Sequence, residues 1–326
     1  MGVVPLKLVG TTSKGEDVHQ ITLSKGELTV TLLTLGAIVQ DVRLAGVNHG
    51  LTLGSDSIAD YETTMVHHGS LIGPVANRIS TARVRLDGMV YELERNQDGR
   101  IHLHSGADAT HRRVWHVADV TGDSATLTIS MPDGLCGLPG NRTITATFSI
   151  SGTSTLTLEI EAITDSTTLM NFANHSYWNL DGTGRFDGHT LRIDAATYLP
   201  TDQDVCPTGE IAEVDGTEMD FRNTRVLDFA TVALDTNFCL ADGNRPARDV
   251  LRLTGKTGIA MVMATTCPGV QIYDGRGAKR PGRDYYEGIA IEAQHWPDAP
   301  NHRSFPSIKV SPENPYRQTT CWTFSR

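Results

Sequence analysis

The chain has 326 residues, and its 28 lysines and arginines against 38 aspartates and glutamates give a formal net charge of −10. An acidic surface repels phosphate backbones and anionic lipid headgroups, which argues against nucleic acid or a membrane surface as a partner. Hydrophobic residues make up 39% of the chain and charged residues 20%, so the chain can bury a sizeable core, and disorder as its main state is excluded.

The first half of the chain predicts one short helix and several short strands. Residues 57–66 are the best helical candidate. Residues 84–93 predict a hairpin, because Asp87 and Gly88 can take the positive φ angles of a tight turn. Over residues 125–131 every second residue is apolar, which places these side chains on one face of a sheet.

Further hairpins follow along the chain. Residues 144–150 and 156–160 alternate in the same way on either side of a Ser-Gly-Thr-Ser turn, and residues 251–253 pair with 259–263 across a Gly-rich turn. Turn residues are scattered throughout, with 31 Gly and 14 Pro, and no repeat or linker interrupts the pattern. We therefore expect an all-β fold, a large antiparallel β-sandwich that forms a single domain over residues 1–326.

Cysteine usage and hydropathy indicate the compartment. The five cysteines are far apart and never form a C-x-x-C pair, which argues against a disulfide framework and a thiolate metal site. The most apolar stretch, residues 28–39, is interrupted by Thr and Gly, and the first ten residues lack the long apolar run of a secretory signal. We expect a cytoplasmic protein.

Polar side chains occur where a strand pattern should not contain them. In residues 288–294, Ile289 and Ile291 share one face of a strand, while Glu292 and Gln294 share the other with small alanines. An isolated pattern of this kind fits a solvated edge strand. The stiff loop that follows, rich in Pro and aromatic residues, favours the floor of a pocket instead.

A second polar segment spans residues 171–180. In an extended chain, Asn171, His175, Tyr177 and Asn179 share one face. A buried amide or imidazole without a partner costs about 1–3 kcal/mol, so this composition contributes little to a fold. A sugar site uses the mixture, because aromatic rings stack on C–H faces while amides and imidazoles bond hydroxyls. The alternative is a histidine satisfied inside the core.

Four histidines raise the possibility of a metal site. His102 and His104 share a face of an extended strand, and His67 and His68 offer further ligands. No third ligand is fixed by spacing, and adjacent His67 and His68 point in opposite directions in an extended segment. We therefore expect neither a metal nor a cofactor.

Two groups of basic residues leave alternatives open. Arg78 follows Asn77 in an otherwise apolar run, where it either forms a structural ion pair or donates to a substrate hydroxyl. Residues 276–283 hold four basic side chains, and their Gly and Pro content favours a solvated loop over a phosphate site.

These segments together resemble the aldose 1-epimerase (galactose mutarotase) family, in consistent order over nearly the whole chain. The motifs that carry the resemblance are Leu53-Gly-Ser-Asp56, Gly73-Pro-Val-Ala-Asn-Arg-Ile79, His102-Leu-His-Ser-Gly106, Pro132-Asp-Gly134, Asn174-His-Ser-Tyr177, Pro207-Thr-Gly-Glu-Ile211, Met219-Asp-Phe-Arg222, Asp235-Thr-Asn-Phe238, Pro268-Gly-Val-Gln271 and Ile291-Glu-Ala-Gln294. The resemblance implies the galactose mutarotase-like supersandwich. It also implies cofactor-free interconversion of the α and β anomers of free aldoses such as glucose or galactose, a step of carbohydrate metabolism.

The resemblance also implies roles for single residues. Glu292 resembles the general base of the family and His175 its general acid. The residues expected to contact the substrate are Arg78, Asn77, His104, Asp235, Gln294 and Tyr177. Ser105 and Trp178 depart from the commoner Gly and Phe, and we expect them to reshape the pocket wall.

Several properties stay open at this point. Burial of Glu292 behind Trp296 should raise the pKa of its carboxyl, while a nearby charged His should lower it. Other hypotheses are a sugar-binding module without turnover, a glycosidase that pairs Glu292 with Asp235, and a hexose-phosphate epimerase. The substrate is expected to be a small monosaccharide and the protein a monomer or homodimer.

Overall fold

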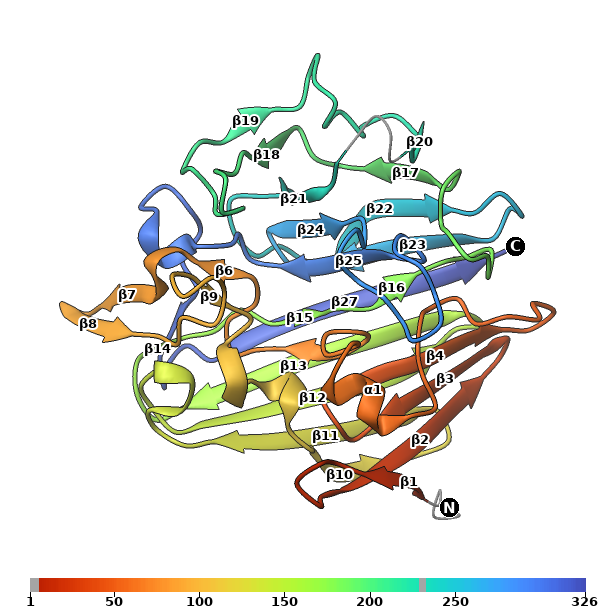
Figure 1. The fold of residues 1–326 in the computed structure, drawn as a ribbon, viewed down its shortest axis with the longest axis horizontal. Helices are drawn as coiled ribbons and strands as arrows, with labels where there is room; N and C mark the ends of the chain where they lie inside the picture. The colour runs from red at the N-terminus through yellow and green to blue at the C-terminus, as the bar shows by residue number, and fades with distance from the viewer. Residues whose placement is uncertain (1–5, 229–232) are drawn as a thin grey trace.

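A computed structural model describes residues 6–228 and 233–326, so the first five residues of the N-terminal segment lie outside it. Regular structure in this part is almost entirely β, and its strands pair antiparallel (Figure 1). The predicted all-β fold is confirmed. No helix among the described residues has the length and apolar character needed to cross a membrane.

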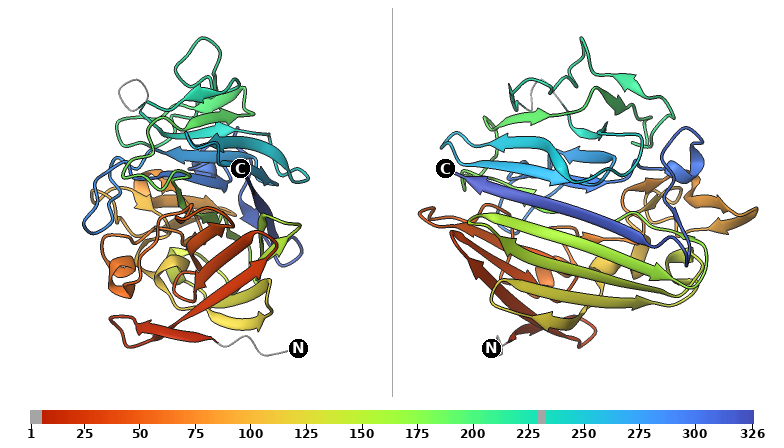
Figure 2. Two further views of the ribbon diagram at one scale, coloured as in Figure 1. Left: turned by 90° about the vertical axis from the view of Figure 1, so that its right-hand side faces the viewer. Right: turned by 180° about the vertical axis from the view of Figure 1, so that it is seen from behind.

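One layer of the sandwich is a long curved sheet, which Figure 2 shows from behind. In the described part it has nine strands, in the spatial order β10 (His116–Val120), β11 (Ser124–Met131), β12 (Arg142–Ser151), β13 (Thr155–Thr164), β27 (Tyr316–Ser325), β23 (Ala260–Thr265), β22 (Arg248–Thr254), β17 (Thr190–Ile193) and β20 (Arg225–Val226). Leu127, Phe148 and Leu158 lie on its buried face, as their alternation predicts. The hairpins β12–β13 and β22–β23 are confirmed.

The other layer consists mainly of two smaller sheets. Among residues 6–228 and 233–326, the first has the order β1 (Lys7–Thr11), β2 (Asp17–Lys25), β3 (Leu28–Leu33) and β4 (Ile38–Leu44), and the second the order β16 (Tyr177–Trp178), β25 (Ile289–Gln294), β24 (Gly269–Tyr273), β21 (Asp235–Cys239), β18 (Thr197–Leu199) and β19 (Ala212–Glu213). Both layers contribute to a single hydrophobic cluster, which includes Leu23, Leu32, Phe148, Leu158 and Ile291.

Short elements connect and flank these layers. The two-stranded pairs are β5 (Leu71–Ile72) with β15 (Ala173–Asn174), β6 (Arg78–Ile79) with β9 (His102–Leu103), β7 (Arg83–Leu86) with β8 (Met89–Glu92), and β14 (Thr168–Leu169) with β26 (Lys309–Val310). The helical pieces are α1 (Ile58–Glu62) and the 3₁₀ turns η1 (Ser80–Ala82), η2 (Gly106–Asp108), η3 (Thr110–Arg112), η4 (Leu135–Gly137) and η5 (Ala299–Asn301). The helix predicted within 57–66 is confirmed in shorter form. The β7–β8 hairpin turns at Asp87 and Gly88, both with positive φ, as predicted.

Strand β25 links the core to a cavity. Its odd-numbered side chains, Ile289 and Ile291, lie in the central hydrophobic cluster, whereas Ala290 contacts Tyr177 on the other side of the sheet. Glu292 follows on that same side and lines the cavity. Every residue of β25 is buried, so the alternative of a solvated edge strand is wrong.

Candidate active site

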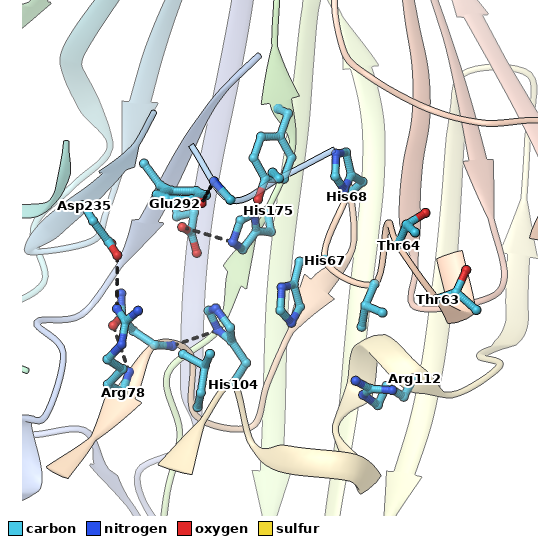
Figure 3. A pocket seen from close by; sticks show the side chains of 17 residues that line it. Thr63, Thr64, His67, His68, Arg78, His104, Arg112, His175, Asp235 and Glu292 are labelled. Atoms are coloured by element: carbon cyan, nitrogen blue, oxygen red, sulfur yellow. Dashed lines mark hydrogen bonds and ion pairs between the residues drawn. The ribbon is translucent and has the colours of Figure 1, made fainter. Parts of the chain in front are cut away.

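A cavity of about 380 Å³ opens on the side of β25 that faces away from the core (Figure 3). Segments distant in the sequence meet there: the turn before β5, the β6–β9 pair, the chain between β15 and β16, and strands β21, β24 and β25. The side chains or backbone of these residues line it: Thr63, Thr64, Val66, His67, His68, Asn77, Arg78, Leu103, His104, Arg112, His175, Tyr177, Asp235, Tyr273, Gly277, Ala278 and Glu292.

Glu292 and His175 meet at the base of this cavity. Oε1 of Glu292 lies 3.4 Å from Nε2 of His175, and the two side chains are 2% and 5% exposed. The other carboxylate oxygen of Glu292, Oε2, is buried and has no hydrogen-bond partner among the described residues. A buried polar atom that no protein group satisfies beside a cavity is suited to bond a ligand hydroxyl.

Burial decides the direction in which both pKa values move. It raises the pKa of Glu292 well above its ordinary value; the negative charge of Asp235 adds to the rise and Arg78 opposes it. Burial lowers the pKa of His175 well below 6.5, and neighbouring His67 and His68 act in the same direction. The sequence alone left open whether the pKa of Glu292 is raised or lowered; in the structure it is raised. Trp296, expected to shield it, packs on Phe305 outside the cavity.

A bonded network stands beside the pair. Asp235 on β21 accepts from Gln271 Nε2 on β24 at 2.6 Å and from Arg78 Nη1 on β6 at 3.4 Å. The Arg78 Nε atom donates to Gln97 at 3.1 Å. Arg78 therefore combines the structural ion pair with a place in the cavity wall. Its charge is compensated, and its direction is set from two sides.

Asn77 and His104 are held by a local turn. Asn77 adopts a left-handed φ of 65°, which Asn tolerates better than most residues. Its backbone N–H donates to Nδ1 of His104 at 3.1 Å. In neutral imidazole the proton of His104 then belongs on Nε2, which is a hydrogen-bond donor. This geometry suits contact with a sugar oxygen.

Three histidines come together that the sequence pattern did not group. Potential ligand atoms of His67, His104 and His175 lie within 4.8 Å of one another, which is the arrangement that could hold a metal ion. A metal on His104 Nε2 requires a bare nitrogen there, and the Asn77 N–H at Nδ1 favours the opposite tautomer. The donor set therefore fits hydroxyl groups better than a cation.

The expected geometry of His102 and His104 is wrong. His102 and His104 do not share a strand face, because β9 ends at Leu103 and His104 has a φ of 51°. His102 turns away and bonds the Glu94 carbonyl oxygen at 2.8 Å. His67 and His68 lie in a turn instead of an extended segment, so both line the cavity.

Most of the predicted site residues line the cavity. Glu292 and His175 do so together with Arg78, Asn77, His104, Asp235 and Tyr177. Gln294 is the exception. It is 0% exposed and lies outside the cavity lining, although it shares the strand face of Glu292. Two residues along a strand amount to about 7 Å, which carries its side chain past the cavity. The structure therefore does not support substrate contact by Gln294.

The two expected departures do not alter the pocket wall. Ser105 has a left-handed φ of 61°, and its hydroxyl accepts from the N–H of Val75 at 2.7 Å and donates to the carbonyl of Val75 at 3.0 Å. Trp178 packs against Trp322 and Phe324 in the core. Both residues serve the fold, so this expectation is wrong.

Several residues in or beside the cavity were absent from the predicted site. Tyr273 lines the cavity, and its hydroxyl accepts from the N–H of Gly277 at 2.6 Å. Gln271 anchors Asp235 from the neighbouring strand. Arg112 ends the 3₁₀ turn η3. Gln271 closes the motif at 268–271, which was a usable signal, whereas nothing local marks Arg112.

The sequence is similar to those of known proteins over nearly its whole length. A sequence model of the aldose 1-epimerase family matches residues 19–322. Galactose mutarotase from Bos taurus is 32% identical over 326 residues and 94% of each chain is covered. Aldose 1-epimerase from Escherichia coli K12 is 29% identical over 315 residues, with 90% of each chain covered. The chain belongs to the aldose 1-epimerase family, a family of isomerases.

Solved structures agree with this assignment. An aldose epimerase homologue from C. elegans superposes with a TM-score of 0.88 at 29% identity, covering 95% of this chain and 99% of the other. Galactose 1-epimerase from Lactobacillus acidophilus gives a TM-score of 0.85 at 26% identity, with 99% of each chain covered. The fold is thus the galactose mutarotase-like sandwich that the resemblance implies.

Proposed function

We propose that this chain interconverts the α and β anomers of an aldose, with Glu292 as general base and His175 as general acid. The single observation that carries the proposal is the contact of these two buried groups at the base of a polar cavity. Family membership supports the reaction class, and the unpartnered Oε2 of Glu292 supports a hydroxyl-binding role.

The reaction needs two proton transfers. Glu292 removes the proton from the O1 hydroxyl while His175 protonates the ring oxygen O5. The C1–O5 bond then breaks and yields an open-chain aldehyde. Rotation about the C1–C2 bond presents the other face of the aldehyde, and the ring recloses by the reverse transfers. Each positioned proton transfer contributes about 10²–10⁴-fold to the rate.

The protonation state of the pair follows from its burial. Burial raises the pKa of Glu292 and lowers that of His175, so before a sugar binds a proton shared by the pair is favoured on Glu292. A sugar hydroxyl that donates to Oε2 stabilises the carboxylate and lets the proton move to His175 through the 3.4 Å contact. Substrate binding thereby produces the base and the acid together.

The remaining cavity residues position the sugar. Arg78 and Asp235 offer a donor and an acceptor whose directions are set by mutual contact, and His104 Nε2–H is a donor. Asn77 holds His104 through its backbone, and Tyr177 supplies a ring that stacks on His68 at 4.2 Å between centroids. Such polar groups with ring surfaces suit a monosaccharide.

The organisation of the protein completes the proposal. We propose a single domain, because strands of both layers share one hydrophobic cluster. All five cysteines are unpaired, which favours a reducing, cytoplasmic compartment. A net charge of −10 disfavours nucleic acid as a partner, and the protein is expected as a monomer or homodimer.

Polarimetry tests the function directly. Freshly dissolved α-D-glucose and α-D-galactose should lose optical rotation faster in the presence of the protein, and xylose, arabinose and fucose extend the panel. Activity on no aldose would overturn the proposal. Calorimetric binding without turnover would indicate a sugar-binding module, and release of an aryl group from an aryl glycoside would indicate a glycosidase.

A further inference from the structure

The cavity continues beyond the catalytic pair to a rim that the proposed chemistry does not use. His67 lies next to His175, with ring centroids 5.5 Å apart and planes inclined by 25°. Past His67 the wall ends in three exposed residues, Thr63, Thr64 and Arg112 (Figure 3). Together with His67, these three residues form the outer rim of the cavity.

Arg112 differs from the other basic side chains near the cavity. Within residues 6–228 and 233–326, no ion pair and no hydrogen bond engages its guanidinium group. Arg78 is paired with Asp235, and Arg276 with Asp274. An uncompensated guanidinium at the mouth of a polar cavity is suited to bind an anionic ligand.

The basic stretch at 276–283 does not offer the same opportunity. Arg280 and Arg283 both contact the buried carboxylate of Glu287, and all three residues line a different surface depression. Their charge is thus neutralised within the fold. The expected solvated loop is in part an ion-paired one, and a phosphate site there loses its support.

The chemistry of the catalytic pair sets the direction in which an aldose lies. Glu292 takes O1 and His175 takes O5, so the line from Glu292 to His175 runs from O1 toward the ring oxygen. The carbon on the far side of O5 is C5, which carries C6. The C2 hydroxyl lies on the opposite side of C1. An aldose held in this way directs C6 past His175 toward His67, and C2 toward the side of Glu292 on which Arg78 lies (Figure 3).

The charged side chains also act on different parts of the cavity. The positive charge of Arg112 acts on His67 and His111, whereas Asp235 and Arg78 act on Glu292. Burial lowers the pKa of His67 to about 4, so its imidazole is neutral at pH 7 and can donate one hydrogen bond. The outer rim thus combines a full positive charge with neutral donors.

We propose that the preferred substrates are aldoses that carry an anionic group on the carbon remote from C1, a phosphate or carboxylate at C6, bound by Arg112 and the outer rim. This inference rests on the proposed function, because Glu292 and His175 define the orientation of the ring. The guanidinium fork matches the oxygens of phosphate and carboxylate in two parallel hydrogen bonds. Thr63, Thr64 and His67 supply the remaining neutral contacts.

The test compares three sugars by NMR exchange spectroscopy, which measures anomer exchange at equilibrium above the uncatalysed rate. Glucose, glucose 6-phosphate and glucuronate are used with wild-type protein, with Arg112→Gln and with Arg113→Gln. The neighbouring Arg113 does not line the cavity and is the matched control. The ratio of kcat/KM for each anionic sugar to that for glucose should fall about tenfold in Arg112→Gln and stay unchanged in Arg113→Gln.

The outcomes separate this inference from the function on which it rests. A fall with glucose 6-phosphate alone supports a phosphate, and a fall with both anionic sugars supports the shared anionic chemistry. A ratio that is equal in wild-type protein and Arg112→Gln overturns the inference while exchange of glucose keeps the proposed function intact. If no sugar exchanges faster than without protein, the proposed function itself fails.

Discussion

The two ends of the cavity differ in how their polar groups are satisfied. At the inner end, Arg78, Asp235 and Gln271 bond one another, so their directions are set before any ligand arrives. At the outer rim, His67 and Arg112 make no side-chain hydrogen bond within the described residues. Preorganised groups cost little to reorganise during a reaction. The inner end therefore suits the part of the sugar where chemistry occurs, and the outer rim the part that distinguishes substrates.

Replacing Glu292 should have the largest effect. Glu292→Gln keeps the shape of the side chain and removes the base, so kcat should fall by about 10²–10⁴-fold. Polarimetry on glucose measures it, and His175→Asn should show a comparable loss. If Glu292→Gln retained wild-type kcat, the inner end would hold a different base.

The same variant should not be less stable at neutral pH. A carboxyl whose folded pKa is raised contributes stability at low pH that is lost as the pH rises through the folded value. Gln does not titrate, so the stability of Glu292→Gln does not fall in this way as the pH rises. The Tm of the variant at pH 8 should therefore equal or exceed that of wild-type protein. A lower Tm would mean that the loss of activity reflects unfolding.

The pH profile of kcat/KM is the second prediction. The singly protonated pair persists from the lowered pKa of His175 to the raised pKa of Glu292, so activity should be level between these two pKa values. Below and above this window it should fall about tenfold per pH unit. An acid limb centred near pH 6.5, the ordinary value for His, would contradict the burial of the pair.

The third prediction tests the bonded network at the inner end. Gln271→Ala removes the 2.6 Å bond that orients Asp235, which should raise KM about fivefold and change kcat less. Gln20→Ala is the control, because Gln20 donates to Gln40 outside the cavity. An unchanged KM would show that Arg78 alone suffices to orient Asp235.

The smallest effect is expected on stability in mild acid. Burial lowers the pKa of His111 well below 6.5, and in the part of the chain that the structure describes neither of its ring nitrogens has a hydrogen-bond partner. Stability from such a group is present above pH 6.5 and is lost as the pH falls. Between pH 7 and pH 6 the free energy of unfolding of wild-type protein should therefore fall by about 1 kcal/mol more than that of His111→Phe. Urea unfolding at both pH values measures this difference. Exposed His116→Phe should show no such difference.

Local pattern predicted the long strands better than the short ones. In β12 and β13 every second residue is buried, because ten-residue strands against a core must alternate. The segment at His102 carries the same alternation but turns after two residues. There the bond between His104 and Asn77 outweighs the local preference. Strand patterns near the cavity therefore indicate polar residues without indicating where they point.

Glu292 and Gln294 show the limit most clearly. Both stand on one face of β25, and nothing in the pattern distinguishes them. Their partners on the neighbouring strand β24 distinguish them, because Glu292 lies opposite Gln271 while Gln294 lies opposite Gly269. Only the first of these positions reaches the cavity.

The sequence by itself determined the fold class and the main hairpins, and it singled out Glu292 and His175 as the proposed catalytic pair, because alternation and ordered motifs are properties of the chain. Tertiary structure decided which polar residues share the cavity and how burial moves their pKa values. It also decided that Arg112 reaches the rim with no partner among residues 6–228 and 233–326. These properties depend on distances between segments far apart in the sequence, from the turn at His67 to strand β25, and no local pattern carries such distances.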